Sequence, residues 1–415
     1  MAAQSGDRDI LVPALEGALA RWEVWKRGKT LIGQHPPGDA VLAPLAAAIE
    51  KCDVYKPVAG HSLFSGYSGV VLHAPSLALP LLYHADRADL GAGAVTAAAD
   101  WLIRTLETRK ADGVFIVVIW GLSVDREAKI AKGMTLVPFD QLSDSHMKRR
   151  IAERAEFTKR SRRAWNHSVW SSQNSYDVPG AAIVRKVAKF PYIGSPAKSF
   201  GRLAKLEAEA KAPLSFLQTS ATGQPLVTGS WFEYEDKDLD FNEHENYLVL
   251  SMPEIVPNVR SHVSVDPDAL ARDATALWSL PSDWQDDMLR SMERFTLSQC
   301  RHQIVDQVVD LAIAFEIATH GSGEGPMSWK AAVRSAQLIG GRLPRRQKNR
   351  LAIEELFKIR SRGAHGGSLK ASERKKHEAV LNEARGIYRA ALASFLSLGA
   401  RPDWKALELE PRTRK

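Results

Sequence analysis

Cysteines, long apolar runs and metal-binding spacings are all scarce in this sequence. The 415 residues include only two cysteines, Cys52 and Cys300, far apart in the chain. This excludes a disulfide framework and is typical of a reducing compartment. No apolar run reaches the roughly 18 residues that a membrane-spanning helix needs, and residues 1–17 lack the basic and then apolar segments of a secretory signal. We therefore expect a cytoplasmic protein with no membrane partner.

The sequence also lacks the short motifs that hold metals or nucleotides. Its 12 histidines are scattered, with no His-x-x-x-His and no Cys-x-x-Cys pair. The acids of Asp236–Glu245 have calcium-loop spacing, but Phe241 and Tyr247 stand where an EF-hand needs Gly and Glu. Gly321–Pro326 is not followed by Gly-Lys-Ser/Thr, so we interpret it as a helix-connecting loop. We expect no metal and no cofactor.

The positive charge is unevenly distributed. The net charge of +8 comes from 56 basic and 48 acidic residues. From Arg290 onward there are 24 basic and 13 acidic residues, which leaves 32 and 35 for the rest of the chain. All of the positive excess thus lies in the last third. A basic domain beside a nearly neutral one indicates contact with a polyanion, the alternative being solubility alone.

The first two-thirds of the chain mixes helical and strand patterns. Apolar spacing and β-branched runs predict three helices and five strands. The helices are Ala40–Cys52, Ala94–Lys110 and Ser143–Arg163. The strands are Gly113–Gly121, Lys129–Phe139 with a glycine at a turn, Ala181–Phe190, Leu226–Tyr234 and Tyr247–Met252. Basic and aromatic residues combine in Lys159–Trp165 and at Trp170, as they do in nucleic-acid grooves, although a surface loop has the same composition.

The pattern becomes entirely helical after Val265. Asp266 followed by Pro267 marks a helix start. Short connections between the following helices predict an antiparallel bundle. Its four helices are Leu297–Thr319, Ser328–Ile339, a third from Pro344 towards Gly366, and a fourth that starts near Ser372 and includes Phe395.

The third of these helices ends with an arginine and a histidine that suit RNA cleavage. RNA carries its own nucleophile, the ribose 2′-OH, so the protein must move protons and stabilise a phosphorane. His365 can act as general base or acid near neutral pH. The fork-shaped guanidinium of Arg360 can bind the phosphate and the developing charge. Such a mechanism needs no metal.

The string from Leu351 to Gly367 resembles the Arg-x4-6-His signature of HEPN domains. Two further segments, Asp306–Glu316 and Ala331–Gly340, resemble the matching helices of the Apea-like HEPN family. The likeness covers about residues 299–398. It implies a HEPN helical bundle and a metal-independent endoribonuclease whose cut leaves a 2′,3′-cyclic phosphate. It also implies a site shared across a homodimer, and a toxin or phage-defence effector whose attached region restrains or triggers it.

Several residues around the motif are candidates for supporting roles. Ser361 can orient the arginine or the phosphate, although family members more often have Asn, Asp or His there. Glu316 lies on an apolar helix face, where it either pairs with Arg360 or is an ordinary exposed glutamate. The candidate RNA-binding residues are basic and flank the motif: Arg345, Arg346, Lys348, Arg350, Arg362, Arg374, Lys375 and Lys376.

The spacing within the motif carries a geometric condition. Residues five apart lie about 140° apart around a regular α-helix of roughly 3.6 residues per turn. Arg360 and His365 can therefore share a face only where the helix widens or ends. Gly363, Gly366 and Gly367 would permit a local bulge or a C-cap at this point. Without a shared face, both side chains can simply interact with the last helix carbonyls.

The sequence predicts an α+β N-terminal region followed by an all-α C-terminal HEPN helical bundle. We place a sensor or regulatory region in residues 1–265, a helical linker in 266–296, the bundle in 297–400 and a tail in 401–415. The first functional hypothesis is a dimeric endoribonuclease that acts on RNA, with an unknown trigger or inhibitor. The alternatives are an inactive HEPN module that binds nucleic acid, a nucleotide or a protein partner, and an activity located in the N-terminal region.

Overall fold

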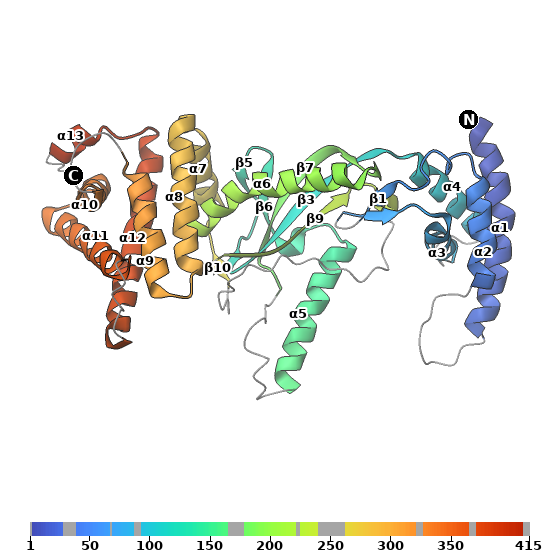
Figure 1. Cartoon of the computed structure of the whole chain (residues 1–415), viewed down its shortest axis with the longest axis horizontal. Coiled ribbons are helices and arrows are strands. Elements are labelled where there is room, and N and C mark those ends of the chain that lie inside the picture. The colour runs from blue at the N-terminus through green and yellow to red at the C-terminus, as the bar shows by residue number, and fades with distance from the viewer. Residues whose placement is uncertain are drawn as a thin grey trace. The chain divides into compact units, whose positions relative to one another are not determined.

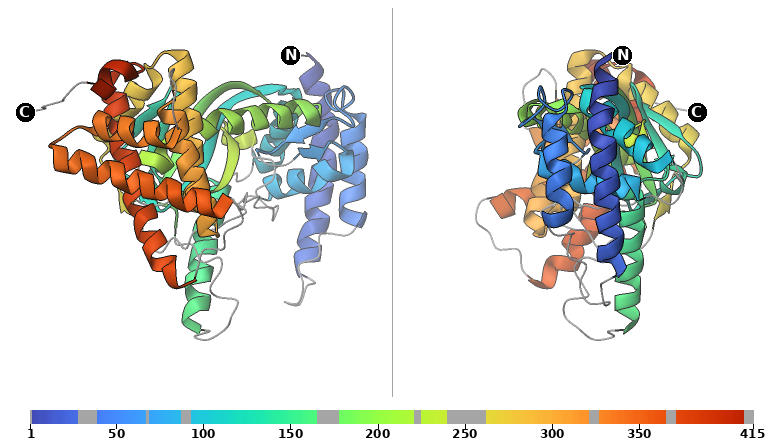
Figure 2. Two further views of the ribbon diagram at one scale, coloured as in Figure 1. Left: turned by 60° about the vertical axis from the view of Figure 1, so that its left-hand side comes forward. Right: turned by 90° about the vertical axis from the view of Figure 1, so that its right-hand side faces the viewer.

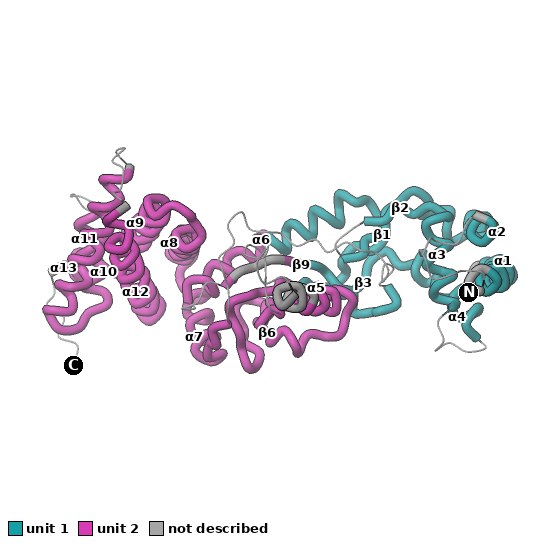
Figure 3. Tube along the Cα trace, turned by 90° about the horizontal axis from the view of Figure 1, so that it is seen from below, with its two compact units in different colours: residues 1–116, 185–207, 231–249 teal, residues 117–184, 208–230, 250–415 magenta. Residues whose placement is uncertain are grey.

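The computed structural model contains two compact units whose segments alternate along the chain. One unit consists of residues 1–116, 185–207 and 231–249, and the other of residues 117–184, 208–230 and 250–415 (Figure 3). The structure describes residues 2–27, 39–66, 69–86, 93–164, 178–220, 225–239, 262–320, 327–364 and 371–409. The N-terminal part combines helices with sheets, and the part from α7 (Pro267–Trp278) onward is all helical (Figure 1). The predicted fold class, α+β followed by all-α, is confirmed at this level.

The first unit contains four helices that pack against one another (Figures 1 and 2). These helices are α1 (Ala2–Arg27), α2 (Asp39–Lys51), α3 (Ala74–Ala85) and α4 (Ala94–Glu107). A small antiparallel sheet of order β2-β1-β8 accompanies them, with β1 (Ser62–Phe64) between β2 (Gly69–Val71) and β8 (Ile193–Gly194). The predicted helices at Ala40–Cys52 and Ala94–Lys110 are confirmed as α2 and α4.

A five-stranded sheet of order β5-β6-β7-β3-β9 forms the main β structure. Its strands are β5 (Ala128–Ala131), β6 (Met134–Pro138), β7 (Ala181–Pro191), β3 (Lys110–Trp120) and β9 (Leu226–Tyr234). The strand predicted for Lys129–Phe139, with a glycine at a turn, is two strands in the structure: β5 and β6 form an antiparallel hairpin that turns at Gly133, where φ is +71°. Glycine adopts this backbone conformation without a steric penalty. The predicted strand at Tyr247–Met252 lies outside the described residues.

Two more helices and a short parallel pair complete this region. The helices are α5 (His146–Ala164) and α6 (Pro196–Ser220), and the pair consists of β4 (Leu122–Ser123) and β10 (Val263–Ser264). Short 3-10 turns follow β6 at Phe139–Gln141 and β9 at Lys237–Leu239. Helix α5 confirms the helix predicted at Ser143–Arg163.

The all-helical part has seven helices among the described residues. They are α7, α8 (Ser282–Cys300), α9 (Ile304–Ala318), α10 (Met327–Ile339), α11 (Leu343–Ala364), α12 (Arg374–Leu398) and α13 (Trp404–Leu409), with a 3-10 turn at Ala371–Glu373 before α12. The Asp266 side chain accepts from the Asp268 amide and caps α7, as predicted from Asp-Pro. Gly340 and Gly341, with φ of +72° and +90°, end α10.

One predicted helix of this part is wrong. The sequence predicts an unbroken helix at Leu297–Thr319, but the chain turns at residues 301–303, so that α8 ends and α9 begins there. Residues 266–296, predicted as a linker, contain α7 and most of α8, and the predicted tail 401–415 contains α13. The boundaries at 265, 296 and 400 stay predictions. The helices near Ser328–Ile339, Pro344 and Ser372 are confirmed as α10, α11 and α12.

Helix α9 occupies the centre of this helical part, since α8, α10, α11 and α12 all pack against it. Its buried side chains include Val308, Leu311 and Phe315. Phe315 meets the ring of Tyr388 edge-on at 5.4 Å, and Tyr388 stacks on Phe295 of α8 at 4.7 Å. Burial of each such side chain stabilises the fold by about 1.5–3 kcal/mol. Among the described residues, no helix has both the length and the apolar character that a membrane span requires.

A buried arginine attaches α13 to the rest of the helices. Arg334 of α10 is 2% exposed, and its Nε lies 2.7 Å from Oε1 of Glu408 on α13. It also donates to the Thr319 carbonyl at 2.7 Å, and its guanidinium lies 5.1 Å from the ring of Trp404. Since a buried charge needs partners of this kind, α13 is an integral part of the helical core.

We expect Gly113→Ala to destabilise the protein by about 1–3 kcal/mol, the usual cost of overpacking. A Cβ on Gly113 of β3 would collide with the Glu233 carbonyl of β9 and approach Cε1 of the Phe232 ring to 2.7 Å. Denaturant unfolding measures the loss. Gly194→Ala is the matched control, because a Cβ there meets nothing within 4 Å. Equal effects of the two substitutions would contradict this account.

We expect the Cys52 thiol to resist alkylation at pH 9. Burial, with Asp7 and Asp53 nearby, raises its pKa to about 12, so the native thiol stays protonated while an unfolded cysteine ionises near pH 9. Because the folded pKa is raised, this group's contribution to stability is complete below pH 9 and is lost as the pH rises towards 12. Iodoacetamide labelling of native and urea-unfolded protein measures the difference, and equal rates would refute it.

Candidate functional site

Helix α11 positions the predicted motif. It begins at Leu343 with Pro344 in its first turn, where a missing N–H costs nothing. One face buries Ile353, Leu356 and Ile359 against α9, α10 and α12. The exposed side of α11 carries the basic residues and also an exposed leucine, Leu351. Arg360 lies near the end of α11, with 30% of its side chain exposed.

Arg360 is held by two neighbours. Its Nη1 donates a hydrogen bond to Oε1 of Glu316 on α9, and the two groups form an ion pair with side-chain exposures of 30% and 22%. The guanidinium also lies 5.7 Å from the ring of Phe357, one helical turn earlier. The sequence leaves open whether Glu316 is exposed or paired, and in the structure it is paired with Arg360. This contact orients Arg360 and leaves the rest of its guanidinium fork for other acceptors.

The end of α11 is regular, and Gly363 has a packing role. The described backbone stays α-helical to Ala364, so the described part of α11 contains no local bulge, one of the two options that the glycines would permit. A Cβ on Gly363 would lie 2.6 Å from Cγ1 of Val305 on α9. Glycine is therefore needed so that α9 can approach closely. Ser361 is exposed, one residue beyond Arg360.

His365 lies outside the described residues, as do Gly366 and Gly367. The histidine follows directly after the last described residue of α11. Its distance and direction from Arg360 therefore stay predictions, together with its role in catalysis.

Most of the predicted RNA-binding side chains are exposed and form ion pairs on the helix surface. Lys348 pairs with Glu383 of α12 at 3.1 Å, and Arg350 with Glu354 at 3.3 Å. Arg362 and Lys376 lie 3.9 and 3.8 Å from Glu355, and Arg374 pairs with Glu378 at 2.9 Å. Exposed pairs of this kind contribute about 0–1 kcal/mol, so a phosphate can displace the carboxylate.

The remaining three basic residues differ from these. Arg346 is half-buried, and its Nη1 donates a hydrogen bond to the Gln337 side chain of α10, which gives it a structural contact. Arg345 and Lys375 are exposed and form no ion pair within the described part of the chain. Within the described residues, no carboxylate therefore competes with an anion for these two side chains.

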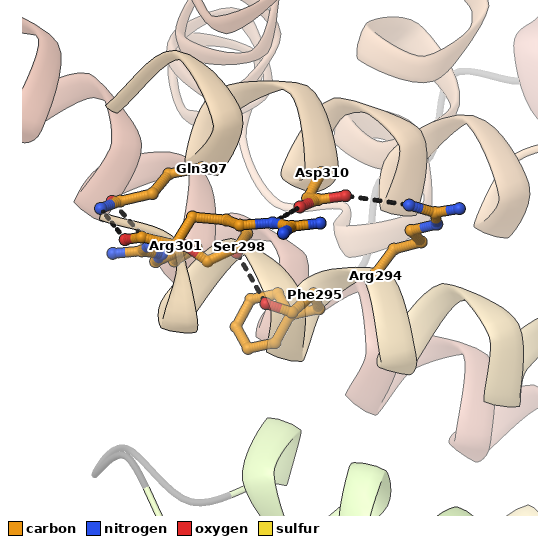
Figure 4. Close-up of polar contacts among 7 residues, drawn as sticks. Arg294, Phe295, Ser298, Arg301, Gln307 and Asp310 are labelled. Carbon is orange, nitrogen blue, oxygen red and sulfur yellow. Dashed lines mark hydrogen bonds and ion pairs between the residues drawn. The ribbon is translucent and has the colours of Figure 1, made fainter. Parts of the chain in front are cut away.

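A second polar cluster, at the turn between α8 and α9, was not predicted (Figure 4). Asp310 of α9 is 4% exposed, and its two carboxylate oxygens accept from Arg294 at 3.0 Å and from Arg301 at 2.9 Å. The Gln307 side chain donates to the Arg301 carbonyl at 2.7 Å. An acid on the apolar face of a predicted helix was the available signal, but its partners come from the turn that the sequence pattern hides.

Two arginines of α12 lie beside this cluster. Arg385 donates to the Ser298 carbonyl and, at 3.2 Å, to Oε1 of Gln307. Arg389 donates to the Thr219 carbonyl at 3.0 Å and to Oε1 of Gln299 at 3.3 Å. Burial lowers the pKa of both, and for Arg385, which also feels the charge of Arg389, the pKa falls to about 10. Neither has a carboxylate partner among the described residues.

The weaker motifs lie partly outside the described residues. Of Asp236–Glu245, only residues 236–239 are described; there Asp238 pairs with Arg104, and its carbonyl accepts from Trp101. Gly321–Pro326, Trp165 and Trp170 are outside the described residues. Within the described ranges, no group of three or more histidine, cysteine or acidic residues is arranged to hold a metal ion.

Comparisons with protein-family models, with curated proteins and with solved structures found no match to this chain.

We expect Gly363→Ala to destabilise the protein by about 1–3 kcal/mol, because the added methyl group meets Val305. The double variant Val305→Ala/Gly363→Ala should lose less than the sum of the two single variants, since the smaller side chain makes room. Urea unfolding of the three variants and the parent gives the comparison. Additive losses would show that the contact with Val305 does not determine the need for glycine.

Proposed function

We propose that this protein is a metal-independent endoribonuclease of the HEPN type. In this proposal the ribose 2′-OH attacks the adjacent phosphate, and His365 moves the proton as general base or acid. Arg360 binds the phosphate and stabilises the charge of the phosphorane. Ser361 lies beside it and contributes a hydroxyl group to the same site. The products are a 2′,3′-cyclic phosphate and a free 5′-hydroxyl.

The observation that carries the proposal is the attachment of Arg360 to Glu316. A side chain that must meet a transition state has to be held in one orientation, because a loosely placed charge gains little. Glu316 comes from a neighbouring helix and contacts one end of the guanidinium. Arg360 is thereby positioned near the end of α11, five residues before the predicted histidine.

The basic surface of α11 and the start of α12 supports RNA as the substrate. Arg345 and Lys375 are exposed without ion pairs in the described part of the chain, and Lys348, Arg350, Arg362, Arg374 and Lys376 are held only by surface pairs. Phosphates compete well for such side chains, and counterion release adds to the affinity. Binding should therefore weaken steeply with salt.

The wider proposal follows the same resemblance. The HEPN bundle would form a homodimer, and the α+β region would restrain or trigger the nuclease, as in toxins and phage-defence effectors. We also propose a cytoplasmic location, which agrees with two cysteines that are both free thiols.

A second function is favoured by the same ion pair. Because Glu316 neutralises part of the charge on Arg360, the pair also suits a catalytically inactive HEPN module that binds nucleic acid, a nucleotide or a protein partner. In that case Arg360 would stabilise the contact between α9 and α11. The two functions differ in one measurable respect, which is whether RNA is cut.

We expect the purified full chain to cleave single-stranded RNA in EDTA. His365→Ala should lower the rate by about 10²–10⁴-fold, the usual contribution of a general acid or base. Arg360→Ala should lower it by about 10²–10³-fold through lost charge stabilisation. Arg360→Lys should restore little of this, since lysine lacks the fork. Gel analysis of end-labelled RNA and detection of the cyclic phosphate measure these effects.

The matched control is His61→Ala, which removes an exposed histidine far from α11 in the sequence. It should cut RNA like the parent. If parent and His365→Ala cut equally, the activity does not belong to this motif. If the parent binds RNA in a salt-dependent way but never cuts it, the binding module replaces the nuclease as the function.

A further inference from the structure

We infer that the α8–α9 turn is a coupling element that links the C-terminal end of α6 to the helix end carrying Arg360. That a change at α6 would alter RNA cleavage rests on the proposed nuclease. That a change at α6 reaches the end of α11 does not depend on it. Three sets of contacts make this link, at α6, at the turn itself and at α11.

The first set joins α6 to α8 and α12. The carbonyls of Gln218 and Thr219, in the last turn of α6, accept from Gln299 at 3.3 Å and from Arg389 at 3.0 Å. Arg389 also donates to the Gln299 side chain and lies 5.0 Å from the ring of Phe295. The last carbonyls of a helix carry partial negative charge, so α6 supplies the acceptor for a half-buried guanidinium without a carboxylate partner in the described chain. Release of α6 would leave Arg389 without that acceptor.

The second set makes the turn rigid. The carbonyl of Ser298, in the last turn of α8, accepts a hydrogen bond from Arg385. Arg385 also donates to the Gln307 side chain of α9. Gln307 donates back to the Arg301 carbonyl, and Arg301 is fixed to the buried Asp310 (Figure 4). The end of α8 and the first two turns of α9 are thus held as one piece. A displacement at Gln299 would therefore reach α9 through these contacts.

The third set joins α9 to the end of α11. Val305, in the first turn of α9, fills the space in front of Gly363, with Cγ1 2.6 Å from where a Cβ would stand. Glu316, near the other end of α9, holds Arg360. Helix α9 therefore contacts α11 at two places, at Arg360 itself and at the nearby Gly363. A shift of α9 that follows from α6 changes the surroundings of Arg360.

The test uses hydrogen exchange of the full chain, which needs no substrate. Arg389→Ala should raise amide exchange in residues 358–364 of α11 by about five-fold or more, in line with ordinary coupling energies. Exchange in α1 and α2 should stay unchanged. Gln299→Ala should give a weaker effect in the same direction, and it serves if Arg389→Ala does not fold.

Two controls separate coupling from general weakening. Arg290→Ala removes an exposed arginine of α8 that pairs with Asp287, and it should leave exchange in α11 as in the parent. Leu407→Ala removes a buried side chain of α13 and should raise exchange throughout the helices. If Arg389→Ala resembles Leu407→Ala, or changes only α6 and α8, the coupling inference is wrong.

A double-mutant cycle sharpens the result. Arg389 and Gly363 share no contact in the described chain, so independent effects of Arg389→Ala and Gly363→Ala on exchange at the α11 end would multiply. Coupling through α9 predicts a departure from that product. RNA cleavage is measured on the same variants: a parent that does not cut overturns the proposed nuclease, whereas the exchange results alone decide the coupling.

Discussion

The buried carboxylate of Asp310 fixes the position at which α9, the central helix of the all-helical part, begins. Removing such a group from water is costly unless it is paired, and here both of its oxygens accept from arginines of α8 and of the turn. The pairs set where α9 starts and how it is rotated. Four other helices pack against α9, so their positions follow from the same constraint. Arg360 is one of the side chains placed in this way.

The arginines and lysines of the all-helical part have two kinds of partner. On the outer faces of α11 and α12, lysines and arginines pair with glutamates that are exposed to solvent. Other anions can readily replace these glutamates. Inside, Arg385 and Arg389 rely on carbonyl groups at helix ends, and Arg334 combines a glutamate, a carbonyl and an aromatic ring. The first kind of contact suits a surface that binds, and the second kind fixes the arrangement of helices.

The sequence pattern predicted the elements that local periodicity determines. It missed the features that depend on contacts between residues far apart in the chain. The strands around Phe115 and Ile183, the end of α10 at Gly340 and the fold class all follow from such local signals. The break between α8 and α9 was missed because residues 301–303 contain no glycine or proline and the apolar spacing continues across them. Helices α1, α3 and α6 were missed, and each contains an internal proline. The contact of Glu316 with Arg360 was only one of two options, since choosing between them requires knowing how α9 and α11 pack.

The two contacts of α9 with α11 also constrain the number of residues between them. Val305 and Glu316 are eleven residues apart, which is about three turns at 3.6 residues per turn, so both point to nearly the same side. Inserting or deleting one residue between them would rotate one contact away from the other by roughly 100°. Many substitutions on the exposed side of α9 would leave this alignment intact. Natural variants of this segment should therefore differ in composition more readily than in length.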